Sequence, residues 1–125
     1  MNVRLQLDLD FMAGVYHENQ LYLNQYSVSL SLLTQTVDAA ATNVAVDRVK
    51  AFIHGELANT VFFGPEDPDL VEMFTMLGIN VTTLPEEPID QIIGIMLYCK
   101  LNAILEQRMF VTSVTIQSDL GDNVR

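Results

Sequence analysis

The sequence predicts a single α+β (or α/β) domain: a mixed sheet of four or five strands with about three helices packed on it. Two observations support this class. From Gln25 onward, segments with strand periodicity alternate with segments of helical periodicity, which is typical of helices packed on a sheet. The 125 residues suffice for one domain and are too few for two ordinary ones. We therefore predict one domain over residues 1–125, with a loose polar tail at 118–125.

The first two predicted elements are strands. Apolar and polar residues alternate through residues 3–10 and again through residues 26–32, which is the period of a strand with one buried face. Gly14 and the polar run 17–20 separate the two segments. This arrangement favours an antiparallel hairpin with a long connecting loop.

Three shorter elements follow. Thr42 or Asn43 begins a predicted helix that continues to about Leu57, with apolar residues at spacings of three and four. Residues 60–63 form a short buried-type strand. The run Asp67-Pro68-Asp69 is typical of a helix start, and Gly78 of a helix end. Residues 79–84 then return as a strand.

The longest predicted helix covers about residues 88–107, and a last strand rich in Val, Thr and Ile covers 109–117. The helix is apolar on more than one side, so we expect it to be central or to lie at a subunit interface. Gly94 in its middle predicts a close approach by another element. The candidate oligomer interface consists of Ile93, Met96, Leu97, Leu101 and Ile104.

Two topologies remain open for residues 60–84. A strand-helix-strand crossover would make the two strands parallel, with a right-handed connection. In a ferredoxin-like sandwich, the helix at Asp67 would instead be an insertion between antiparallel strands. Periodicity does not distinguish them.

Charge restricts the partners of the chain. The formal net charge is −10, and the six basic residues are scattered at Arg4, Arg48, Lys50, Lys100, Arg108 and Arg125. Because nucleic-acid affinity comes largely from basic residues on phosphates, this disfavours nucleic-acid backbones, and it also disfavours anionic membranes. Basic proteins and divalent cations remain favoured. No cofactor is evident apart from such a cation.

Three further features concern compartment and assembly. The single cysteine, Cys99, allows no internal disulfide, and its apolar neighbours predict a buried structural thiol. We expect a soluble cytoplasmic protein, because no signal peptide or membrane span is evident. Half of the residues are apolar and only 18% are charged, so we expect a homo-oligomer that covers some of this surface.

Acidic residues provide the main candidate site. Between Ala51 and Cys99 the chain has eight acidic residues and no Lys or Arg. If residues 60–84 form a parallel crossover, seven of them share one rim of the sheet, at the edge where ligands bind in open α/β sheets. Acids at helix starts also complement the helix dipole without any ligand. The predicted rim comprises Glu66, Asp67, Asp69, Glu72, Glu86, Glu87 and Asp90.

A second candidate site consists of Asp8, Asp10, His17 and Glu18. Asp8 and Asp10 share one face of a strand, and a turn that returned His17 and Glu18 to them would create mixed oxygen and nitrogen ligands for a divalent metal. Acids on an exposed strand face also serve solubility and edge protection.

These features give two functional hypotheses. The first is a small acidic, non-enzymatic interaction or accessory protein that homo-oligomerises and binds a basic partner through the rim. The alternative is a divalent-metal-dependent hydrolytic enzyme that uses the clustered carboxylates. The sequence identifies no catalytic residue.

Overall fold

The computed structural model describes residues 3–34, 38–106 and 109–121. These residues form a five-stranded mixed sheet and three α-helices, so the predicted α+β class is confirmed. The strands are β1 (Val3–His17), β2 (Gln20–Thr34), β3 (Val61–Phe63), β4 (Val81–Thr83) and β5 (Met109–Ser118). The helices are α1 (Ala39–Ala51), α2 (Pro68–Met76) and α3 (Asp90–Leu105), and the π-helical segment η1 (Phe52–Leu57) continues α1.

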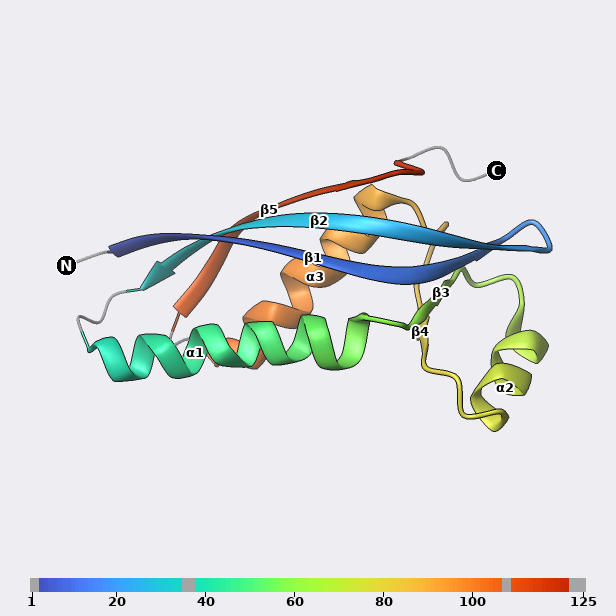
Figure 1. Cartoon of the computed structure of the whole chain (residues 1–125), viewed down its shortest axis with the longest axis horizontal. Helices are drawn as coiled ribbons and strands as arrows, with labels where there is room; N and C mark the ends of the chain where they lie inside the picture. The colour runs from blue at the N-terminus through green and yellow to red at the C-terminus, as the bar shows by residue number, and fades with distance from the viewer. Residues whose placement is uncertain (1–2, 35–37, 107–108, 122–125) are drawn as a thin grey trace.

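The strand order is β4-β3-β1-β2-β5 (Figure 1). β1 pairs antiparallel with β2, and β2 pairs antiparallel with β5. β3 pairs parallel with both β1 and β4. The segment from β3 through α2 to β4 is therefore the parallel crossover, and the antiparallel ferredoxin-like alternative is wrong for these strands.

The hairpin between β1 and β2 is tighter than predicted. β1 continues through Gly14 to His17, and only Glu18 and Asn19 form the turn. Both have positive φ, 50° and 65°, as two-residue hairpin turns of one common type require. Gly14 belongs to the strand, where it pairs with Leu23 of β2 and Val61 of β3. An added Cβ would lie 3.3 Å from Leu21 Cδ1 and 3.2 Å from Val61 Cγ2.

One face of the sheet carries the core and the other is open. Phe11, Ala13 and Val15 of β1 are buried, while alternate residues such as Asp10 and Met12 are exposed. On β2, Tyr26 and every second residue up to Thr34 are buried. These side chains pack with residues of α1, η1 and α3 in one cluster.

α1 begins earlier than predicted. Asp38 accepts hydrogen bonds from the backbone N–H groups of Ala40 and Ala41, which makes it the N-cap. The acid lies four residues before the predicted cap at Thr42, whose own N–H bonds to the Asp38 carbonyl. At the other end, η1 keeps Ile53 and Leu57 buried.

α3 buries a single stripe. Every fourth residue from Ile93 to Leu105 is buried, whereas Ile95 and Tyr98 are exposed. Cys99 is also exposed, so the predicted buried thiol is wrong; its position lies off the stripe. A Cβ on Gly94 would lie 3.3 Å from Ile116 Cγ2 of β5, which is the expected close approach, made by a side chain.

The C-terminal residues begin with an ordered section. Ser118 ends β5, and its hydroxyl donates to the Asp90 carboxylate at 2.7 Å. The Gly121 N–H donates to the Ser118 hydroxyl, and the Asp90 N–H to the Gly121 carbonyl. Ser118 and Gly121 therefore contact the start of α3. The looseness of the tail 118–125 stays a prediction, and its last part, 122–125, lies outside the described residues. Within the described ranges, no helix combines the length and apolar character needed to cross a membrane.

Candidate functional site

Three parallel strands end at the same edge of the sheet. The last residues of β1, the hairpin turn after it and the loops after β3 and β4 surround a pocket of about 280 Å³ at this edge. Ligands in open α/β sheets bind beyond the carboxyl ends of the strands. The pocket is lined by Tyr16, His17, Glu18, Gly64, Pro65, Glu66, Asp67, Pro85, Glu86, Glu87 and Pro88.

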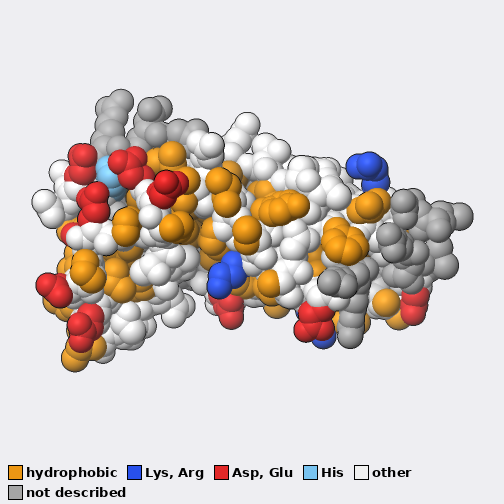
Figure 2. All heavy atoms as spheres, turned by 180° about the vertical axis from the view of Figure 1, so that it is seen from behind, with side chains coloured by type: hydrophobic (Ala, Val, Ile, Leu, Met, Phe, Trp, Pro, Cys, Tyr) orange, Lys and Arg blue, Asp and Glu red, His pale blue; other side chains and the backbone are white. Residues whose placement is uncertain are grey.

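The pocket is strongly acidic. Five of its lining residues are carboxylates, and none is Lys or Arg. They come from the hairpin turn (Glu18), the loop after β3 (Glu66 and Asp67) and the loop after β4 (Glu86 and Glu87). Figure 2 shows acidic side chains gathered around a histidine at one end of the molecule. The arrangement creates a local field that attracts cations.

Close backbone packing brings the two acidic loops together. A Cβ on Gly64 would lie 3.3 Å from the Glu86 carbonyl oxygen and 3.6 Å from Pro88 Cδ. A side chain at this position would crowd the backbone of the loop after β4, so glycine favours the close approach of the two loops. Pro65, Pro85 and Pro88 restrict the backbone further by fixing φ. The backbone of the two loops that carry these carboxylates is therefore restricted in conformation.

His17 is the nitrogen base of this pocket. Its side chain is 15% exposed, and its Nε2 lies 3.6 Å from Glu18 Oε1, which belongs to a side chain 73% exposed. The pair is an ion pair when the imidazole is protonated. His17 thus lies at the wall of the pocket and Glu18 at its mouth.

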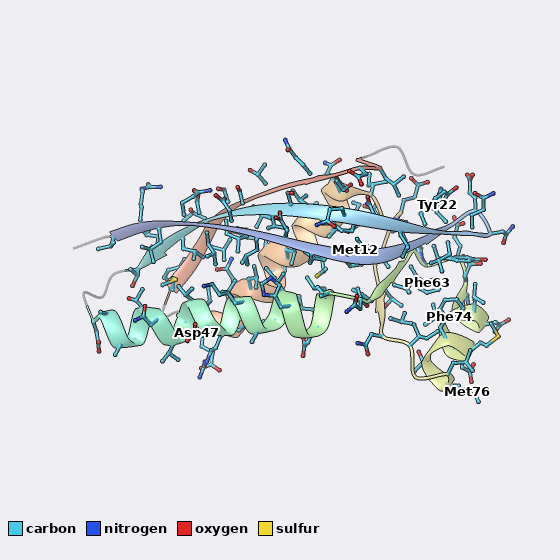
Figure 3. The ribbon with its side chains drawn as sticks, viewed as in Figure 1. Met12, Tyr22, Asp47, Phe63, Phe74 and Met76 are labelled. Carbon is cyan, nitrogen blue, oxygen red and sulfur yellow. The ribbon has the colours of Figure 1, made fainter. Side chains whose placement is uncertain are left out.

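Three aromatic rings in contact form a column beside the pocket. Tyr16 stacks on Phe63 with ring centroids 5.1 Å apart, and Phe63 meets Phe74 of α2 edge to face at 5.4 Å. Edge-to-face and offset-stacked pairs are the favourable arrangements of aromatic rings. The column joins β1, β3 and α2, and Figure 3 shows Phe63 and Phe74 along it.

The parallel crossover collects four of the seven predicted rim residues, namely Glu66, Asp67, Glu86 and Glu87. Asp69 and Glu72 are exposed on α2 and do not line the pocket. Asp90 is only 6% exposed and bonds to Ser118. It belongs to the contact between α3 and β5 rather than to the rim.

The residues of the second predicted site are separated by the strand that carries them. Asp10 and His17 are seven residues apart in β1, which corresponds to about 23 Å in an extended strand. Asp8 accepts a hydrogen bond from the Ser29 hydroxyl at 2.5 Å. The four side chains therefore do not meet at one ion. Among the described residues, no group of three or more His, Cys, Asp or Glu side chains is arranged to hold a metal.

The candidate interface residues divide by burial. Ile93, Leu97 and Leu101 are fully buried within the chain's own core, and Met96 and Ile104 are partly buried. A single chain does not test self-association, which stays a prediction. The large apolar side chains that α3 exposes are instead Ile95 and Tyr98.

Sequence reasoning missed the part of the pocket contributed by the hairpin. The sequence groups His17 and Glu18 with Asp8 and Asp10, because Gly14 and the polar run 17–20 predict an earlier turn. It gives Tyr16, Gly64 and the three prolines no role in a site. The available signal was the cluster of prolines and glycine around both acidic runs, which indicates fixed loops.

No protein-family model matches the chain, and no curated protein sequence matches it. Solved structures do. An uncharacterised protein, WS1659 from Wolinella succinogenes, superposes with a TM-score of 0.66 at 16% identity, over 94% of this chain and 93% of that one. A catalytic-residue mutant of Plasmodium vivax 6-pyruvoyltetrahydropterin synthase superposes with a TM-score of 0.59 at 12% identity, over 94% and 98%. At these identities the likeness shows that the chain shares their fold.

Proposed function

We propose that this protein is a non-enzymatic binding module whose acidic pocket receives a lysine or arginine side chain of a basic protein partner. The observation that carries the proposal is the composition of the pocket, with five carboxylates and no Lys or Arg around about 280 Å³. A cationic side chain in this space forms charge-assisted hydrogen bonds, which are the strong ones.

The size and shape of the pocket support a side chain as the cation. The five carboxylates come from three separate loops and surround the space rather than converge on a point. A guanidinium or ammonium group on a flexible stem reaches several carboxylates and leaves its apolar stem against Tyr16 and the proline rings.

Calorimetric titration of the full chain with a lysine hexapeptide tests this proposal. The variant Glu86→Gln with Glu87→Gln removes two pocket charges, and we expect its affinity to fall about tenfold, equal to about 1.4 kcal/mol. The matched control is Asp47→Asn with Glu56→Gln. It removes two exposed acids that do not line the pocket and lie on α1 and η1 (Asp47 is labelled in Figure 3). Equal weakening by both variants would mean that net charge alone attracts the peptide and would overturn the proposal.

Self-association is part of the same proposal. β5 is an edge strand, so one side of its backbone has no strand partner among the described residues. Beside it lies an open groove of about 490 Å³ between β5 and α3, with Ile95 and Tyr98 exposed along it. Exposed edges and apolar residues favour pairing with another copy. Light scattering should show an oligomer that Tyr98→Asp converts to a folded monomer; a wild-type monomer at all concentrations would refute this part.

A further inference from the structure

Exposed apolar side chains are concentrated at the end of the molecule that bears the acidic pocket. Of the eleven large hydrophobic residues exposed in the described part of the chain, six lie there. Two of them, Leu21 and Leu23, lie on β2 just after the hairpin turn. The other four, Met73, Met76, Leu77 and Ile79, belong to α2 and the turn after it, and we call them the α2 surface.

α2 is attached to the rest of the protein by one side only. None of its residues is buried, and Met76 and Leu77 are 80% and 68% exposed. Phe74 meets Phe63 edge to face at 5.4 Å, and in Figure 3 Met76 lies at the outer end of the helix. Exposed apolar residues spaced three and four apart share one side of a helix, and such clusters are typical of binding surfaces.

The α2 surface and the acidic pocket adjoin each other and are linked by side-chain contacts. Asp67 lines the pocket and immediately precedes Pro68, the first residue of α2. Tyr16, which also lines the pocket, is linked to Phe74 through Phe63. A partner held in the pocket therefore has the α2 surface within reach along the same helix.

We infer that the α2 surface docks a basic amphipathic helix of the partner protein. Met73, Met76 and Leu77 follow the spacing of three and four that packs one helix on another. Methionine side chains adapt to the shape of an apolar partner. The backbone groups within α2 are bonded along the helix, so side chains rather than strand pairing make the contact.

Charge decides which kind of helix fits. Asp69 and Glu72 are exposed on the same helix, and no Lys or Arg occurs between Ala51 and Cys99. A second copy bound end to end would bring acids against acids in a chain of net charge −10. A helix with one apolar face and one basic face complements both features of this end. The basic character of the partner rests on the proposed function, whereas the apolar contact is independent of it.

Fluorescence anisotropy with a labelled helical peptide of leucine and lysine tests the inference on the full chain. In this probe the leucines form one face and the lysines the other; the comparison peptide has the same composition in an order that forms no apolar face. We expect the wild type to prefer the amphipathic probe, and Met76→Ser with Leu77→Ser to weaken its binding about tenfold. Both residues are mostly exposed, so the variant should fold. The matched control, Val44→Ser, removes an exposed apolar residue of α1 that lies outside the α2 surface, the acidic pocket and the groove beside β5, and it should leave the affinity unchanged.

The two proposals fail in distinguishable ways. If Met76→Ser with Leu77→Ser binds the amphipathic probe as tightly as wild type, the inference is overturned, whatever the pocket variants do. Suppose that Met76→Ser with Leu77→Ser weakens binding of the amphipathic probe, while Glu86→Gln with Glu87→Gln changes the binding of neither this probe nor the lysine hexapeptide. The docking surface then stands and the acidic-pocket function fails. If the serine variant instead converts an oligomer to a monomer and leaves the affinity for the probe unchanged, the α2 surface binds a second copy of the chain and the inference is wrong.

Discussion

The ring of Tyr16 stacks on the ring of Phe63, with centroids 5.1 Å apart and planes 29° from parallel. Tyr16 lines the acidic pocket, and Phe63 in turn meets Phe74 of α2. The exposed helix that follows the pocket is therefore attached by aromatic contacts to the strand that precedes the pocket. Because of these contacts, the acidic pocket and the α2 surface are carried by elements that pack on one another.

Replacing Phe74 should loosen α2 without unfolding the sheet. Phe74→Ala removes the edge-to-face contact with Phe63, for which we expect a loss of about 1–2 kcal/mol in local stability. Hydrogen exchange of the α2 amides should accelerate, while that of β1 and β2 should not. Met76→Ala, at an exposed position on the same helix, should leave the exchange rates unchanged. Equal protection of α2 in Phe74→Ala and wild type would show that other contacts hold the helix.

The hydroxyl of Tyr26 should cost stability. The residue is fully buried, and its hydroxyl has no hydrogen-bond partner among the described residues. An unsatisfied buried polar group costs about 1–3 kcal/mol. We predict that Tyr26→Phe keeps the stacking with Phe11 and raises the free energy of unfolding in denaturant titrations. A clear loss of stability would mean that the hydroxyl is bonded in solution.

Tyr26 should also weaken the fold at alkaline pH. Burial raises the pKa of its hydroxyl well above the ordinary value; the Asn24 side chain lowers the pKa in part, and the Asp90 carboxylate raises it by a lesser amount. The unfolded chain then loses its tyrosine proton near pH ~10, while the folded chain keeps it. The free energy of unfolding should fall as pH rises above that value. Tyr26→Phe should show a shallower fall; identical slopes in both proteins would contradict this assignment.

Ser118 should anchor the end of the chain to α3. Its hydroxyl donates to Asp90 and accepts from the Gly121 N–H. Ser118→Ala removes both bonds beside a buried carboxylate, so we expect a loss of about 1–3 kcal/mol in the free energy of unfolding. Ser113→Ala, at an exposed position of the same strand, is the control. Urea titrations that place both variants at the wild-type value would show that this contact contributes nothing.

Gly64 should control the geometry of the acidic pocket. A Cβ there would lie 3.3 Å from the backbone oxygen of Glu86, and backbone yields less readily than a flexible side chain. Gly64→Ala should push the two acidic loops apart and weaken lysine-hexapeptide binding several-fold in a folded protein. Gly55→Ala is the matched control, because nothing lies within 4 Å of its added Cβ. Unchanged binding by Gly64→Ala would show that loop contact does not shape the site.

Sequence periodicity predicted most of the fold because each long strand has one buried face. Alternation in β1 and β2 follows the burial of Phe11, Ala13, Tyr26 and Val28. The length of β1 could not be predicted, because Gly14 and a polar run are also typical of a loop. Gly14 continues the strand by pairing with Val61 of β3, a residue 47 positions away in sequence.

The sequence also predicts only part of the acidic pocket, because contacts between residues distant in sequence decide which acids line it. Acidic runs after two strands, together with a parallel crossover, correctly place Glu66 and Asp67 beside Glu86 and Glu87. Asp90 follows the same pattern in sequence, yet the end of β5 covers it through Ser118. Local patterns show which residues begin a helix, but contacts between distant strands decide which of them meet solvent.

Zero-length carbodiimide cross-linking of the lysine hexapeptide to the full chain would test the acidic-pocket function most directly. The reagent joins a carboxylate to an amine only where the two are in contact, and peptide mass spectrometry identifies the carboxylate. The account predicts salt-sensitive cross-links concentrated on the pocket acids, Glu18, Glu66, Asp67, Glu86 and Glu87. Cross-links spread equally over exposed acids elsewhere, such as Asp47 and Glu56, would contradict it.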